Sequence, residues 1–228
     1  MSAVSSRVRA LIASAITMLV VAGCAAPSPD KQPNGDPLET PASSQATSSS
    51  GPTTLFNEPW LVEEGVWWIT THPDTYPPSR GAFAGQRNGL LGAKRPGTLW
   101  LFLPALYGKY HLRMELLNSP PPVSGRFKDV VEVSFRSSGS LEMGSFETFA
   151  TSMPVPAGTY RVRLSATDLD RTQRETNRGE FRRGGYKTYR GLILLQLWPA
   201  PARHDAVLRE GTRFAHRAHH DLPSGEYP

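Results

Sequence analysis

The middle of the chain alternates between apolar and polar residues over short stretches. In residues 110–116 every second residue is apolar, and residues 160–165 repeat the pattern with Arg161 and Arg163 at polar positions. A period of two is typical of a β-strand with one face in the core and one in water. Further short stretches rich in β-branched and other apolar residues are 66–69, 98–103, 130–135, 140–143 and 146–152.

Residues 192–198 are a nearly continuous apolar run, which predicts a strand buried on both faces in the middle of the domain. With the other stretches this makes about eight short strands, and almost no helical periodicity is present. The 21 Pro and 20 Gly also favour turns over long helices. We therefore expect an all-β domain, an antiparallel β-sandwich or barrel-like fold, over residues 59–201.

The first 23 residues have the pattern of an export signal. Arg7 and Arg9 form a basic start, and the uncharged, mostly apolar stretch 10–22 follows. This stretch is shorter than the roughly 20 apolar residues that a membrane-spanning helix needs. Residues 21–24 read Val-Ala-Gly-Cys and resemble the bacterial lipobox. The resemblance implies cleavage before Cys24, lipidation of its thiol and export to the extracytoplasmic side of the cell membrane.

Residues 24–58 are expected to link this lipidated cysteine to the domain. Of the 34 residues that follow Cys24, 18 are Pro, Gly, Ser or Thr, and large apolar side chains are nearly absent. Such a segment buries too little surface to offset its conformational entropy, so we expect it to be disordered. A flexible chain of this length reaches roughly 30 Å, which would hold the domain clear of the bilayer.

Residues 202–228 are predicted to be a C-terminal tail, as a short helix or disordered. On a helix, His216 and His220 would share a face at a spacing that can bind zinc, and Asp221 lies beside them. No Glu follows His216 in the manner of the HExxH motif. A solvated tail without metal is the preferred interpretation, with a metal site as the alternative.

Two other features are candidate binding residues. Residues 167–190 contain seven basic and four acidic side chains, and we interpret this long connection as a mobile basic surface loop. Trp67 and Trp68 are adjacent, so on a strand they face opposite sides, and one of them could be an exposed platform. The preferred alternative is that the chain covers both. The arginines of the loop that could meet an anionic partner are Arg174, Arg178, Arg182 and Arg183.

Charge and motifs exclude several classes of function. The net charge of +5 falls to +3 once Arg7 and Arg9 leave with the signal, too small a surplus to indicate nucleic-acid binding. Cys24 is the single cysteine, so an internal disulfide or a Cys-rich metal site is excluded. No GxSxG elbow, P-loop or HExxH motif is present, so we expect no catalysis and no cofactor.

Four sequence blocks resemble a family of uncharacterised actinobacterial proteins. They are residues 88–92 (NGLLG), 129–135 (DVVEVSF), 158–163 (GTYRVR) and 194–201 (LLQLWPAP). The resemblance spans about residues 88–201 and implies a bacterial β-domain. The order of the second and third blocks is also similar in layout to the competence protein J family, small inhibitors that bind a nuclease. That likeness implies protein binding.

The favoured hypothesis is a lipid-anchored, non-enzymatic β-domain that binds another macromolecule at the cell envelope, a protein partner in the manner of an inhibitor. The first alternative is a module that binds carbohydrate or an anionic wall polymer through an exposed tryptophan and the basic loop. The second alternative is a metal-dependent hydrolase that uses the histidines of the tail.

We predict that Cys24→Ser abolishes membrane attachment, because the sulfur of Cys24 is the atom that would carry the lipid. Fractionation of cells should then recover the protein uncleaved or freely secreted. A variant that still pellets with membranes after a high-salt wash would contradict the lipoprotein assignment.

Overall fold

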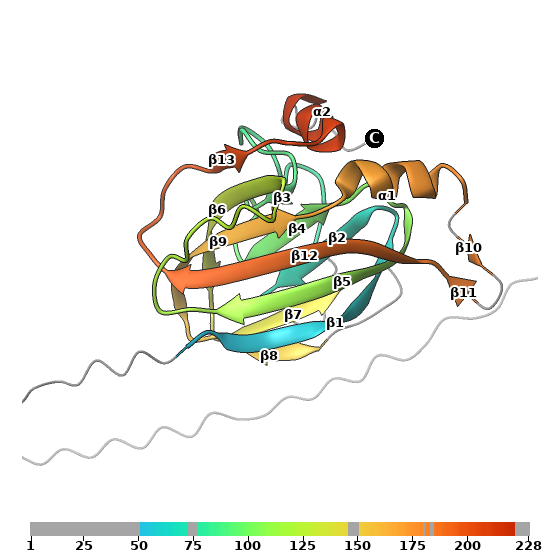
Figure 1. Ribbon diagram of the computed structural model, residues 1–228. Helices are drawn as coiled ribbons and strands as arrows, with labels where there is room; N and C mark the ends of the chain where they lie inside the picture. The colour runs from blue at the N-terminus through green and yellow to red at the C-terminus, as the bar shows by residue number, and fades with distance from the viewer. Residues whose placement is uncertain (1–50, 73–76, 146–150, 180, 183–184, 222–228) are drawn as a thin grey trace, which may run out of the picture. The chain divides into compact units, whose positions relative to one another are not determined.

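A computed structural model of the chain describes residues 51–72, 77–145, 151–179, 181–182 and 185–221 (Figure 1). All of them belong to one compact unit, Ser48–Pro228. The predicted signal peptide, Cys24 and most of the predicted linker lie outside the described residues. Neither helix in this part of the chain is long and apolar enough to cross a membrane.

Strands form two layers, as the alternating patterns predict. Figure 1 shows a larger and a smaller layer, and the strands of each are given below in the order in which they lie side by side. The larger layer is formed by β13 (Ala206–Arg209), β6 (Asp129–Ser137), β9 (Gly158–Ala166), β12 (Thr188–Pro199), β5 (Tyr107–Leu116) and β1 (Thr53–Glu63). The smaller layer is formed by β3 (Leu91–Gly92), β4 (Thr98–Phe102), β2 (Val66–Thr70), β7 (Ser140–Gly144) and β8 (Ser152–Pro154). The expectation of an all-β, sandwich-like fold is confirmed.

A tight hairpin joins the two layers. Glu63 of β1 pairs with Val66 of β2, and the two residues between them, Glu64 and Gly65, have φ of 54° and 71°. Positive φ at both central positions is the geometry of a type I′ turn, whose twist matches that of the strands it joins. Beyond the hairpin, β1 pairs with β5 and β2 pairs with β4 and β7, so the chain passes from one layer to the other.

The main core lies between the layers, where every second residue of each strand points inward. β9 contributes Tyr160, Val162 and Leu164, which are almost fully buried and pack against the inward-facing side chains of the other strands. A second cluster, formed by Val66, Trp68, Ala82, Phe83 and Trp100, lies on the opposite side of the smaller layer.

Three expectations drawn from the sequence are corrected. Residues 53–58, assigned to the linker, form the first half of β1, because every residue from Phe56 to Glu63 pairs with β5. Residues 192–198 do lie on the central strand β12, which is parallel to β5, but only one face is fully buried. On the other face Leu192 and Leu194 are half-buried, and Trp198 alone is buried. More strands are present than the eight expected, since several of two to four residues are too short to show a period.

The predicted basic loop also has regular structure. Within residues 167–190, α1 (Leu169–Thr176) is followed by β10 (Phe181–Arg182), β11 (Gly185–Tyr186) and the start of β12. Leu169 and Thr172 are buried, which fixes α1 on the domain and corrects the interpretation of a mobile loop.

The predicted C-terminal tail is part of the fold. β13 pairs with β6, and α2 (Arg213–Asp221) buries Phe214, Ala215 and Ala218. The ring of Phe214 stacks on Phe102 of β4, with ring centroids 5.2 Å apart. The sequence patterns of the strand β13 and the helix α2 are weak, because β13 has only four residues and α2 only nine.

We predict that Gly89→Ala destabilises the protein by about 1–3 kcal/mol, the usual cost of overpacking a core. A Cβ at residue 89 would lie 1.9 Å from the carbonyl oxygen of Ala218, so α2 would have to move. Gly125→Ala is the matched control, because a Cβ there meets nothing within 4 Å. Equal urea midpoints for the two variants would contradict the docking of α2 on Gly89.

Candidate functional site

Residues 200–205 connect β12 to β13 and cross the outer face of β6 and β9, and we call this segment the strap. Ser134 of β6 fixes its centre, since Ser134 Oγ accepts from the Arg203 amide at 2.8 Å and donates to the Arg203 carbonyl at 3.0 Å. Arg161 of β9 donates from Nη1 to the His204 carbonyl at 2.8 Å. The centre of the strap is therefore held through its backbone, and the Arg203 and His204 side chains are exposed.

Two buried arginines lie on the sheet face that the strap crosses and share one carboxylate. Arg161 and Arg163 are 6% and 5% exposed, although their strand predicts a wet face for them. Arg161 Nε lies 2.9 Å from Glu132 Oε2, and Arg163 Nε lies 2.9 Å from Glu132 Oε1. Two guanidinium groups against one carboxylate leave a surplus of one positive charge in a largely desolvated place.

Arg163 also fixes a second segment. Its Nη1 donates to the carbonyl oxygen of Pro121 at 2.7 Å, which ties residues 120–122 to the sheet. The guanidinium lies over the ring of Trp198 of β12, 5.2 Å from its centroid, a cation–π arrangement. Hydrogen bonds and stacking thus leave both arginines little rotational freedom.

An open groove of about 740 Å³ lies over these groups. Its polar lining comes from Glu132, Arg161, Arg163, Arg203 and His204. Its apolar lining comes from Pro120, Trp198, Pro199, Ala200, Pro201 and Ala206. We call this depression the arginine groove.

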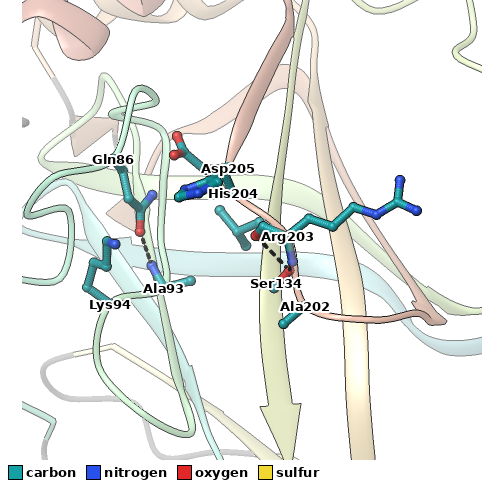
Figure 2. Close-up of a pocket in the computed structure, with 9 residues that line it drawn as sticks. Gln86, Ala93, Lys94, Ser134, Ala202, Arg203, His204 and Asp205 are labelled. Atoms are coloured by element: carbon teal, nitrogen blue, oxygen red, sulfur yellow. Dashed lines mark hydrogen bonds between the residues drawn. The ribbon is translucent and has the colours of Figure 1, made fainter.

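A smaller depression of about 340 Å³ lies between the strap and residues 86–94 (Figure 2). Figure 2 shows Gln86 bonded to the backbone of Ala93, and the side chain of Arg203 extending away from Gln86 and Lys94. Across the two depressions the charged lining is Lys94, Arg161, Arg163 and Arg203 against Glu132 and Asp205, a net charge of +2 with His204 neutral.

Asp205, at the end of the strap, connects it to the loop before β3. Its Oδ2 accepts from the amides of Arg87 and Asn88 at 2.7 and 2.8 Å, and from Asn88 Nδ2 at 3.1 Å. Asn88 is fully buried, and its Oδ1 accepts from the Leu91 amide. This contact gives the NGLLG block a structural role, because its polar groups hold the strap.

His219 of α2 joins the same loop. Its Nδ1 accepts from the Gly89 amide at 2.9 Å, and the side chain is buried. Burial lowers the pKa of His219, with Glu210 and Asp129 opposing the shift, so the imidazole is neutral and can accept this bond.

The residues singled out by the sequence lie in several places. Trp67 and Trp68 are 1% and 2% exposed, so neither is a platform, and the alternative that both faces are covered is right. Arg174 lies on α1 and Arg178 just after it, and both side chains are exposed. Arg182 is in β10 with its side chain undescribed, and Arg183 lies outside the described residues.

His216 and His220 do meet on one face of α2, with ring centroids 4.4 Å apart. The carboxylate beside them is Glu210 and not Asp221, since Glu210 Oε1 lies 2.6 Å from His216 Nδ1. Glu210 precedes α2, so the spacing along the helix gave no sign of it.

No family model matches the chain, and no curated protein matches it. Two solved structures have a distant likeness of layout. One is ComJ from Bacillus subtilis, inhibitor of the DNA-degrading activity of NucA, at 12% identity and a TM-score of 0.46, covering 66% of this chain and all of that one. The other is the crocagin biosynthetic gene J product, at 15% identity and a TM-score of 0.42, covering 67% of this chain and all of that one. The layout likeness to competence protein J is thus found in the structure, whereas the actinobacterial family is not matched.

We predict that Glu132→Gln lowers the free energy of unfolding by about 2–3 kcal/mol, because it leaves two buried cations without a counter-charge. We expect a smaller loss of stability than for a fully buried ion pair, because the Glu132 side chain is 13% exposed. Glu58→Gln, an exposed change on β1, is the control in the same thermal melts. Equal stability of the two variants would show that the arginines do not depend on Glu132.

Proposed function

We propose that this protein is a lipid-anchored, non-catalytic binding module that captures an acidic segment of another envelope protein in the arginine groove. The observation that carries the proposal is the pair Arg161 and Arg163 sharing the single carboxylate of Glu132 at the base of an open groove. An anionic side chain entering the groove would balance the remaining positive charge.

The arginines are already ordered before a ligand enters. Binding usually costs about 0.5–1.5 kcal/mol for each flexible side chain that it immobilises, and Arg161 and Arg163 have met that cost in folding. A planar guanidinium also recognises carboxylates through two parallel hydrogen bonds, which favours Asp and Glu as the groups recognised.

The remaining walls suit a polypeptide. The apolar part of the lining is Trp198, three prolines and two alanines, and arginine, which lines the same groove, is among the residues most often dominant in protein interfaces. Carbohydrate binding has less support, because Trp60 is half-buried and the other four tryptophans are buried. A sugar ring therefore has no exposed indole on which to stack.

The proposed export and lipid anchoring at Cys24 would place the partner at the cell envelope. The lipobox-like residues 21–24 and the Pro- and Ser-rich segment behind them favour a domain displayed on a tether at the cell envelope. An anionic wall polymer shares the charge of an acidic peptide, so the experiment must separate the two.

The test uses the full chain with Cys24→Ser and a fluorescent peptide rich in Glu and Pro, followed by anisotropy at increasing salt. We expect saturable binding that weakens with salt, and no binding of the same peptide with Gln in place of Glu. Replacing Arg203 and His204 by Ala removes the one positive charge of Arg203 and should weaken binding about two- to fivefold, while the backbone bonds of the strap remain.

The matched control replaces Arg174 and Arg178 by Ala, which removes two exposed charges, one on α1 and one just after it, and should leave binding unchanged. If the α1 variant loses binding and the strap variant does not, the site is the basic segment and not the groove. Binding of purified teichoic acid with no binding of the acidic peptide would refute the protein partner and favour the wall polymer.

A further inference from the structure

Three potential metal ligands converge beside α2, away from the arginine groove. His216 and His220 are separated by one turn of the helix, and Glu210 reaches them from the turn after β13. One donor atom from each residue lies within 4.8 Å of the donor atoms of the other two. All three side chains are exposed, so an ion can reach them directly from solvent.

We propose that Glu210, His216 and His220 bind a divalent transition-metal ion of the zinc class. Zinc bonds to imidazole nitrogen and carboxylate oxygen measure about 2.0–2.2 Å, so two ligand atoms on one ion lie within about 4 Å of each other. Atoms already within 4.8 Å reach that spacing by small side-chain rotations.

The ligand types decide which ion the site takes. Calcium and magnesium prefer sets made entirely of oxygen, whereas imidazole suits zinc, copper and nickel. Two histidines and one carboxylate are also the protein ligand set of several zinc enzymes that keep a fourth position for water. Here the fourth position faces solvent, since the His216 side chain is 61% exposed.

The backbone that carries the ligands is fixed at both ends of α2. Thr212 Oγ1 accepts from the Ala215 amide, and Asp170 of α1 accepts from the amides of Arg213 and Phe214 at 3.1 and 2.9 Å. At the other end, His219 is bonded to Gly89. A helix held at both ends presents its side chains at constant spacing, which lowers the cost of ordering them around an ion.

The experiment titrates Zn²⁺ into the full chain by calorimetry, on a Cys24→Ser background so that the thiol cannot bind metal. We expect one ion per chain, a raised melting temperature, and a Co²⁺ derivative with the visible absorption of low-coordinate cobalt. Mg²⁺ and Ca²⁺ should not compete. Glu210→Gln, His216→Ala and His220→Ala should each weaken binding at least about tenfold, since even changes behind the ligands of zinc sites cost that much.

Two control variants test whether the three proposed side chains are the ligands. His204→Ala removes an exposed histidine of the strap and should leave the affinity unchanged, and so should Asp221→Ala. The three ligand changes are on exposed side chains, and circular dichroism should show the folded protein in each case. Binding that is absent in the parent, or that survives all three ligand changes, would overturn the proposal. If Asp221→Ala lost zinc binding and Glu210→Gln kept it, the assigned ligand set would be wrong.

Discussion

Two guanidinium groups lie buried on the outer face of β9, and a buried cation is stable only when charged and polar partners surround it. Glu132 supplies the charge for Arg161 and Arg163, and backbone carbonyls of residues 121, 203 and 204 accept further N–H groups from them. This requirement draws two distant segments, 120–122 and the strap, onto the same sheet face. The groove, its positive charge and its rigid rim all follow from it.

Besides the pairing of β13 and the buried face of α2, three carboxylates that accept backbone N–H groups bind the C-terminal segment, residues 200–221, to the domain. Asp205 accepts from residues 87 and 88, Asp129 from residues 211 and 212, and Asp170 from residues 213 and 214. Bonds from a charged acceptor to a backbone amide are stronger than neutral ones. They place the strap over β9 and hold α2 beside the loop of residues 87–89, so the groove and the metal-ligand cluster depend on the same network.

Local patterns in the sequence predicted the layered β-fold and the placement of residues 192–198 at its centre. They failed where a distant segment changes the environment of a strand. The alternation in residues 160–165 predicts solvent at Arg161 and Arg163, but both are buried: Arg161 bonds to the strap and Arg163 to Pro121, and nothing in the spacing of either segment indicates these contacts. The pairing of Glu210 with His216 was missed for the same reason, since the two residues belong to different elements. Only the i, i+4 relation of His216 and His220 lies within one element, and that relation was found.

The central claim is that the arginine groove is the binding surface of this domain. Its most direct test is a ¹H–¹⁵N NMR titration of the full chain carrying Cys24→Ser with the Glu- and Pro-rich peptide. Binding in the groove predicts saturable shifts in the Trp198 indole N–H, the Arg161 and Arg163 Nε–H groups and the amides of the strap. Saturable shifts confined to α1, with those groove signals unmoved, would contradict it.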